Sequence, residues 1–170
     1  KTAKGNINET ELNEEVPNLI KNSVQLNFIG DLSLFDDSLI QQMKKSEELT
    51  YCDKKNKKLD LVIAASYGGR WDIVNAIKEI KDSGKNNITE QEFSSFLSTA
   101  KFEDPDLCIR TGNEIRVSNF LLWQFAYTEL YFTDCFWPDF DESELQLALD
   151  DYARRQRRYG GHNKTLRVDS

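Results

Sequence analysis

The feature that most constrains the fold is a nearly continuous run of Leu, Val, Ile and Ala at residues 59–66, LDLVIAAS. Such a run is typical of a β-strand that is covered on both faces. Shorter apolar runs with the composition of strands occur at residues 26–30, 106–110 and 130–133. Longer segments with apolar residues at helical spacing separate these runs. The alternation predicts an α/β fold, in which a parallel β-sheet is flanked by helices.

The helical segments carry recognisable start signals. Thr89 and Glu92 form a capping-box pair, and Asp141 and Glu144 make a similar pair at the start of the last helix. The expected helices occupy residues 36–49, 71–80, 88–100 and 120–130, followed by the helix that opens at Asp141.

Length and charge restrict the class of protein. A chain of 170 residues is expected to form a single domain. Its 22 Lys and Arg against 29 Asp and Glu give a net charge of −7, which argues against a general nucleic-acid-binding protein, because such a protein needs a basic face. The most apolar stretch, at 120–127, is far shorter than the ~20 residues of a membrane-spanning helix. The first residues lack the apolar core of a signal peptide.

Cysteine and histidine usage excludes several kinds of site. The 3 cysteines are widely spaced and form no CxxC pair, which favours reduced thiols in a cytosolic protein over a disulfide framework or a zinc site. His162 is the only histidine, so histidine triads and multi-histidine metal sites are excluded.

Ligands of parallel α/β sheets bind at the carboxyl ends of the strands, and two loops there carry suitable residues. The first, Tyr67-Gly68-Gly69-Arg70, combines glycines that let backbone N–H groups approach a ligand with an arginine that could reach it. A tight strand-to-helix turn explains the same residues and is the preferred interpretation of this loop alone.

The second loop, at residues 110–119, is richer in binding groups. Arg110 and Arg116 flank a turn that contains glycine, and Ser118 occupies the position expected for the N-cap of the helix at 120–130. Two guanidinium groups beside a helix N-terminus form a phosphate or diphosphate site. A pair of arginines in surface ion pairs is the alternative. Because both arginines follow the carboxyl end of a strand, the anion site is favoured.

Glu129 is expected at the end of the helix at 120–130, in an otherwise apolar stretch. A lone carboxylate there needs a partner, either an arginine or a hard metal ion. A buried ion pair is the default, and a Mg²⁺ ligand beside a diphosphate is the sharper alternative.

Two further groups of residues have open interpretations. The aromatic residues between Phe120 and Phe140 suit either a core or a subunit interface, and their density favours a dimer surface. The basic run at 154–158, RRQRR, is expected on an exposed helix face, where it is either solvated or contributes to anion binding across an interface.

The segment RTGNEIRVSNFLLWQFAYTELYFTDCFWPDF, which begins at Arg110, closely resembles the C-terminal signature of cis-prenyltransferases, specifically the bacterial undecaprenyl diphosphate synthase (isoprenyl transferase) family. The similarity covers residues 12–161. It continues in register through IGDLS (29–33), LDLVIAASYGGRWDIV (59–74), DPDLCIRTG (104–112) and RRQRRYGG (154–161).

This resemblance implies an enzyme that condenses isopentenyl diphosphate with an allylic diphosphate, such as farnesyl diphosphate, in cis. The product would be a polyprenyl (undecaprenyl) diphosphate, a membrane lipid that carries cell-wall precursors. The family also implies a butterfly-shaped homodimer, Mg²⁺ as cofactor, no nucleic-acid partner and a cytoplasmic location, peripheral to the inner face of the membrane at most.

The resemblance also assigns roles to individual residues. It implies that the diphosphate of isopentenyl diphosphate binds at Arg110, Arg116, Val117 and Ser118. It further implies that Glu129 helps to hold Mg²⁺ across the dimer. The same resemblance assigns a tunnel for the growing chain to Leu59, Leu61 and Ile63, although a plain core strand would have the same composition. The accessory role of Arg70 is expected from its own loop, because its side chain could reach a ligand at the carboxyl edge.

Two departures from the family pattern matter. Ile115 stands where some members have a metal-binding histidine, and isoleucine cannot bind Mg²⁺. No residues match the Asp-Gly-Asn-x-Arg loop, whose aspartate is the catalytic carboxylate. Residues 1–170 are therefore expected to form the C-terminal part of a cis-prenyltransferase domain and to be inactive alone. The alternatives are a non-catalytic partner subunit, whose C-terminal Arg-x-Gly motif is lacking, and an unrelated phosphate-binding α/β domain.

Overall fold

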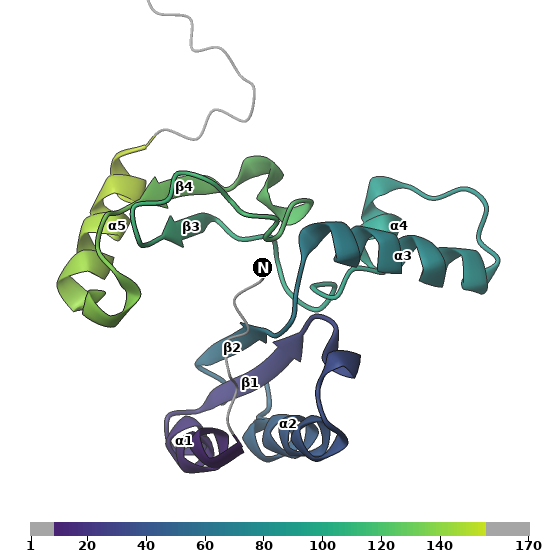
Figure 1. Ribbon diagram of the computed structural model, residues 1–170, viewed down its shortest axis with the longest axis horizontal. Helices are drawn as coiled ribbons and strands as arrows, with labels where there is room; N and C mark the ends of the chain where they lie inside the picture. Colours follow the sequence, from purple (N-terminus) through teal and green to yellow (C-terminus); the bar gives the residue numbers. More distant parts are fainter. Residues whose placement is uncertain (1–8, 156–170) are drawn as a thin grey trace, which may run out of the picture. The chain divides into compact units, whose positions relative to one another are not determined.

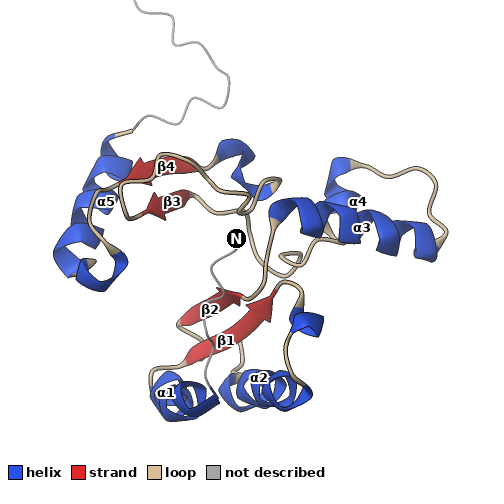
Figure 2. Cartoon of the chain, in the orientation of Figure 1, coloured by secondary structure: helices blue, strands red, loops and turns tan. Residues whose placement is uncertain are grey.

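The computed structural model describes residues 9–155. The chain divides after Phe102 into two compact units, and each unit contains a pair of parallel strands (Figures 1 and 2). We call the described residues up to Phe102 unit 1 and those from Glu103 onward unit 2. Each unit is described by itself.

Unit 1 is built on the parallel pair β1–β2, in register from Val24 opposite Leu59 to Ile29 opposite Ala64. Helices α1 and α2 lie on one face of this pair (Figure 1). The bounds of its elements are α1 Glu9–Lys21, β1 Val24–Ile29, a 3-10 turn Leu32–Leu34, α2 Asp37–Thr50, β2 Leu59–Ala64, α3 Gly69–Ser83 and α4 Glu90–Ser94.

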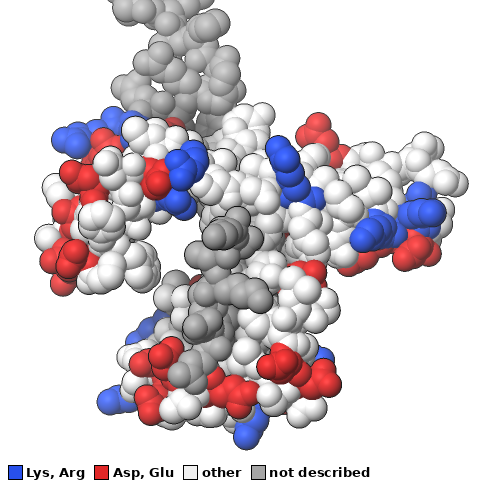
Figure 3. Space-filling model, viewed as in Figure 1, with Lys and Arg blue, Asp and Glu red and all other residues white. Residues whose placement is uncertain are grey.

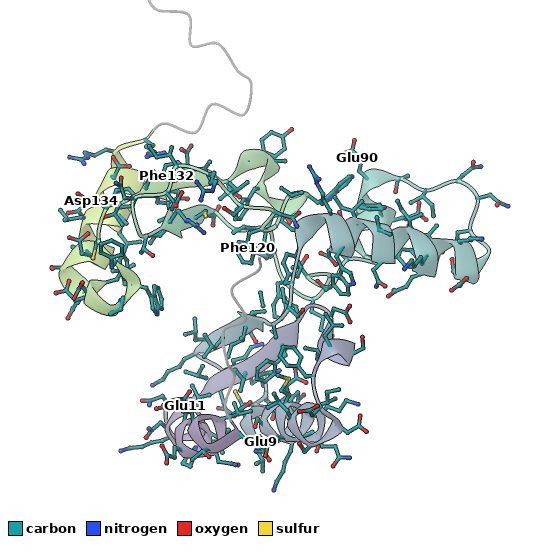
Figure 4. The ribbon with its side chains drawn as sticks, viewed as in Figure 1. Glu9, Glu11, Glu90, Phe120, Phe132 and Asp134 are labelled. Carbon is teal, nitrogen blue, oxygen red and sulfur yellow. The ribbon has the colours of Figure 1, made fainter. Side chains whose placement is uncertain are left out.

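The core of unit 1 forms between the sheet and these two helices. It joins one side chain of α1, one of α2, two of β1 and one that directly follows β2, namely Leu12, Met43, Leu26, Phe28 and Ala65. Figure 4 shows the acidic residues Glu9 and Glu11 on the first turn of α1. Carboxylates at this position stabilise a helix, because its N-terminus carries partial positive charge.

The edge of β1 opposite β2 is closed by side chains from α2. The backbone N–H of Leu26 donates to Oγ1 of Thr50 (3.0 Å), and that of Phe28 donates to Oε1 of Glu47 (2.8 Å). A buried N–H without an acceptor is costly, so these two side chains replace the partners that a further strand would provide.

Unit 2 is built on the parallel pair β3–β4, in register from Leu107 opposite Glu129 to Arg110 opposite Phe132. Helix α5 packs beside β4. The bounds of its elements are β3 Leu107–Arg110, a 3-10 turn Gln124–Tyr127, β4 Glu129–Phe132, a 3-10 turn Trp137–Asp139 and α5 Glu142–Arg154. Figure 4 places Phe132 and Asp134 at the end of β4, beside α5.

The expected strands and the helices at 36–49, 71–80 and after Asp141 are confirmed within a few residues, whereas the helix expected at 88–100 ends at Ser94. Both start signals are also confirmed. Thr89 and Glu92 form a reciprocal capping box, and the side chain of Asp141 accepts from the backbone N–H of Glu144. The parallel pairing and the helices agree with the expected α/β class.

The prediction of a helix at residues 120–130 is wrong. That segment contains only the 3-10 turn Gln124–Tyr127, and Glu129 begins β4 instead of ending a helix. The reason lies in the backbone, because Ser118, Asn119 and Leu121 have φ of 49°, 63° and 42°, which a right-handed helix does not allow.

The surface carries mixed charge. Figure 3 shows acidic and basic side chains interspersed on the visible face of α1 and α2. Over residues 9–155, no helix has both the length and the apolar character that crossing a membrane requires.

Candidate active site

Arg110 ends β3, at the carboxyl edge where the sequence predicts a ligand. The residue is half-buried, and its buried Nε atom has no hydrogen-bond partner among the described residues. A buried guanidinium N–H that lacks an acceptor costs stability, so it needs an explanation. An anionic ligand that supplies the missing acceptor is the simplest one.

The loop that follows Arg110 is held at this same edge. The backbone N–H of Gly112 donates to the carbonyl of Cys135 (2.8 Å), and that of Asn113 donates to the carbonyl of Thr133 (3.1 Å). Both acceptors lie just after β4, so the loop is tied to the carboxyl ends of both strands. Gly112 has φ of 84°, a value that favours glycine.

Strained backbone is concentrated in this loop and directly after it. Among the described residues, six other than glycine have positive φ, and four of them are Asn113, Ser118, Asn119 and Leu121. Strain of this kind costs about 1–3 kcal/mol per residue and clusters at functional sites. Ser118 is therefore not an N-cap, because an N-cap has extended backbone angles. Its place beside Arg116 and the half-buried Val117 is unchanged.

Arg116 is paired with a neighbour in its own loop. Its guanidinium forms an ion pair with the carboxylate of Glu114, and the arginine side chain is 65% exposed. This agrees with the alternative that the arginines form surface ion pairs. Because an exposed pair contributes little to stability, it also leaves Arg116 available to a stronger anion.

Glu129 lies at the opposite end of the strand pair from Arg110. Its partner across the ladder is Leu107, whereas Arg110 is opposite Phe132. The Oε2 atom of Glu129 accepts from Nη1 of Arg155 at 2.9 Å. The expected ion pair is present, but it is partly exposed and not buried, because the two side chains are 27% and 34% exposed. Its partner comes from the basic run that was expected to be exposed. Residues 156–158 of that run, and His162, lie outside the described residues.

The donor set near Glu129 is small. Within the described part of the chain, no group of three His, Cys, Asp or Glu could hold a metal ion. Magnesium in proteins is commonly bound by one or two carboxylates, with phosphate oxygens and water as the remaining ligands. A single hard carboxylate therefore fits a Mg²⁺ that a diphosphate also binds, but not a metal site made of protein alone.

In unit 1, the loops after β1 and β2 lie against each other. Gly30 has φ of 113°, and a Cβ atom there would overlap the carbonyl oxygen of Ala65. The backbone N–H of Asp31 contacts the carbonyl of Ser66 at 3.4 Å. Arg70 lies exposed in the first turn of α3, directly after this contact.

A buried carboxylate fixes the Tyr67–Arg70 loop. Asp72 is 1% exposed, and its two oxygens accept from the hydroxyl of Tyr67 (2.8 Å) and the backbone N–H of Ser98 (2.9 Å). Sequence reasoning missed Asp72, although an acidic residue in the first turn of a helix beside a glycine turn is a usable signal. It also missed Gly30, whose only signal is its position at the end of an expected strand.

Leu59, Leu61 and Ile63 share one face of β2. Ile63 packs against the core of unit 1, whereas Leu59 and Leu61 are 56% and 39% exposed. The expectation that both faces of this strand are covered is therefore wrong for its first half, because the described residues leave Leu59 and Leu61 exposed. Its apolar composition extends beyond the part that the core explains.

Comparison with known proteins decides the family. A family model described as "Putative undecaprenyl diphosphate synthase" matches residues 4–160. The chain belongs to this family.

Similar family members come from several bacteria. The ditrans,polycis-undecaprenyl-diphosphate synthase ((2E,6E)-farnesyl-diphosphate specific) of Wigglesworthia glossinidia brevipalpis is 46% identical over 158 residues, covering 89% of this chain and 60% of the relative. The isoprenyl transferase of Fusobacterium nucleatum is 47% identical over 150 residues, covering 88% of this chain and 64% of the relative. The chain thus spans less than two thirds of the length of these relatives.

Solved structures support the same family. Lavandulyl diphosphate synthase from Lavandula x intermedia, in complex with dimethylallyl diphosphate, is similar with a TM-score of 0.82 and 36% identity, over 89% of this chain and 67% of that chain. A "probable undecaprenyl diphosphate synthase" from Campylobacter jejuni is similar with a TM-score of 0.78 and 33% identity, over 89% of this chain and 70% of that chain. The α/β arrangement of parallel strands and helices is therefore that of undecaprenyl diphosphate synthases.

Proposed function

We propose that this chain provides the isopentenyl diphosphate site of a cis-prenyltransferase that makes a polyprenyl (undecaprenyl) diphosphate. The observation that carries the proposal is the buried Nε of Arg110 at the carboxyl end of β3, for which residues 9–155 provide no hydrogen-bond partner. A diphosphate supplies several acceptor oxygens with negative charge, which suit a guanidinium fork. Arg116, Val117 and Ser118 follow in the same strained loop and complete the site.

The reaction needs charge stabilisation more than covalent chemistry. The carbon–oxygen bond of the allylic diphosphate breaks, a carbon–carbon bond forms to the isopentenyl unit, and that unit loses a proton. The arginines hold the isopentenyl diphosphate in place and offset its negative charge. Mg²⁺, with Glu129 as its ligand from this chain, would ease departure of the diphosphate leaving group. Farnesyl diphosphate is the proposed allylic substrate, as in the name of the Wigglesworthia relative.

The separation of Arg110 and Glu129 supports a homodimer. Arg110 is the last residue of β3, whereas Glu129 is the first residue of β4. The two residues are therefore three positions apart along the parallel pair, which corresponds to about 10 Å. Glu129 would then hold Mg²⁺ beside the isopentenyl diphosphate that the arginines of a second copy bind, next to the allylic leaving group. Exposed aromatic residues of unit 2 suit such an interface, because Tyr127, Phe136 and Trp137 are 64–75% exposed.

The growing chain needs an apolar wall, and the exposed half of β2 suits this role. Leu59 and Leu61, with Ile63 behind them, are proposed to line that wall, and Arg70 is proposed as an accessory anion-binding residue. None of the residues of this chain matches the catalytic aspartate of the family. We therefore expect no condensation by residues 1–170 alone, which a radiolabelled isopentenyl diphosphate assay would test. The enzyme would act in the cytoplasm, at most peripheral to the inner face of the membrane that receives its lipid product.

Replacing Arg116 by Ala in the full-length enzyme tests the assignment. We expect the KM for isopentenyl diphosphate to rise at least about tenfold, because a charge-assisted hydrogen bond contributes about 1.5–3 kcal/mol. The KM for the allylic substrate should change much less. Unchanged turnover together with unchanged affinity for isopentenyl diphosphate would rule out the proposed site.

A further inference from the structure

Arg155 lies between two carboxylates at the C-terminal end of α5. Its Nε and Nη2 atoms lie 2.8 and 2.6 Å from Oδ2 of Asp151, one turn earlier on the same helix. Its Nη1 atom lies 2.9 Å from Oε2 of Glu129, the first residue of β4. The guanidinium is therefore oriented by its own helix and reaches the strand with its remaining nitrogen.

We propose that Arg155 is a positioning residue that holds Glu129 for a divalent cation. This inference rests on the proposed function, in which Glu129 is a ligand of Mg²⁺. The arginine binds Oε2, and among the described residues no hydrogen bond or ion pair involves Oε1. One carboxylate oxygen is thus fixed while the other is left for the cation. Carboxylates that bind metals are commonly fixed by such outer hydrogen bonds.

Charge balance makes this arrangement compatible with a cation. A positive arginine beside a metal ligand would by itself repel the metal. Asp151 compensates for that charge, so the trio of Glu129, Arg155 and Asp151 keeps a net charge of −1, the charge of a lone carboxylate. An arginine guanidinium stays charged at neutral pH, so the trio keeps this balance.

Burial indicates that orientation matters more than the strength of the ion pair. The side chains of Glu129 and Arg155 are 27% and 34% exposed, so solvent screens their attraction. A half-exposed glutamate without a partner would sample several rotamers, and the metal would have to select one of them. Removing Arg155 should therefore change the free energy of cation binding more than the free energy of unfolding.

The test is the affinity of the full-length enzyme for Mn²⁺, used in place of Mg²⁺ and detected by electron paramagnetic resonance. Isopentenyl diphosphate is present without an allylic substrate, so no turnover occurs. Arg155→Gln should weaken Mn²⁺ binding about 10- to 100-fold, and Arg155→Lys should recover part of the loss. Arg154→Gln is the matched control and should bind as the wild type does, because Arg154 is 77% exposed and 3.7 Å from Asp151.

Two further variants keep the inference separable from folding and from the proposed function. Asp151→Asn retains the Glu129–Arg155 pair but removes its anchor and its compensating charge, so it should also weaken Mn²⁺ binding. The thermal unfolding midpoints of all variants should stay close to that of the wild type. Wild-type affinity in Arg155→Gln, or an equal loss in Arg154→Gln, would overturn the role of Arg155. If Glu129→Gln also binds Mn²⁺ normally, the metal assignment in the proposed function fails instead.

Discussion

Replacing Arg110 by Met should separate the binding role of this residue from its folding role. Met keeps most of the apolar length of the arginine stem but removes the charge and the buried Nε. That atom has no hydrogen-bond partner within the described residues, so its desolvation destabilises the folded chain and no hydrogen bond offsets this cost. Such an unsatisfied group costs about 1–3 kcal/mol. The free energy of unfolding of Arg110→Met should therefore be unchanged or higher by about 1 kcal/mol.

Diphosphate binding should move in the opposite direction. Hydrogen bonds to charged groups contribute about 1.5–3 kcal/mol, which corresponds to a loss of roughly 10- to 150-fold in affinity for isopentenyl diphosphate. Arg116→Met is the matched control for stability. Because Arg116 is 65% exposed and paired with Glu114, its unfolding free energy should change by less than about 1 kcal/mol.

Urea denaturation measures the first quantity, and titration calorimetry with isopentenyl diphosphate measures the second. Arg110→Met should be at least as stable as the wild type and should bind the diphosphate poorly. A variant that loses about 2 kcal/mol or more of stability and binds normally would refute this prediction. Arg110 would then be a structural residue with a partner in the folded enzyme.

Two other predictions concern the scaffold. Thr50→Val should lower the unfolding free energy by about 1–3 kcal/mol in urea denaturation, because it leaves the buried N–H of Leu26 without an acceptor; an unchanged value would show that the strand edge has another partner. Hydrogen bonds from Ser143 and from the N–H of Glu144 lower the pKa of Asp141 below 3.8, so its contribution to stability is complete above that pH and is lost as the pH falls through the folded value. Asp141→Asn should remove this part of the acid dependence, and identical pH profiles for the two proteins would contradict the assignment.

Local signals in the sequence predicted much of the fold. The apolar run at 59–66 predicted β2, and the capping pairs predicted the starts of α4 and α5. These features depend on residues within one turn or one strand of each other, so the sequence carries them directly. The carboxyl-edge rule likewise predicted the place of Arg110 at the end of β3.

The features that were missed depend on contacts between distant residues. Serine is a residue type that favours the N-cap, but the backbone around Ser118 is fixed by contacts that the local sequence does not show. The backbone N–H groups of Gly112 and Asn113 in its loop donate to carbonyls just after β4. Arg155 is 26 residues from Glu129 in the sequence, and nothing in the basic run singles it out from its neighbours. Local preference gives way where tertiary hydrogen bonds determine the backbone.

The composition of β2 also gains a physical interpretation. A core strand and the wall of a lipid tunnel both need apolar residues, so the sequence could not distinguish them. The structure of unit 1 separates the strand into two parts, since Ile63 packs against the core while Leu59 and Leu61 are 56% and 39% exposed. Exposed leucines without a partner would be unfavourable in a strand that serves only the core. A hydrocarbon chain lying against them would remove this cost, at about 25 cal/mol for each Å² of apolar surface that it covers. The exposure of Leu59 and Leu61 therefore supports the proposed wall for the growing prenyl chain, whereas the core of unit 1 alone explains Ile63.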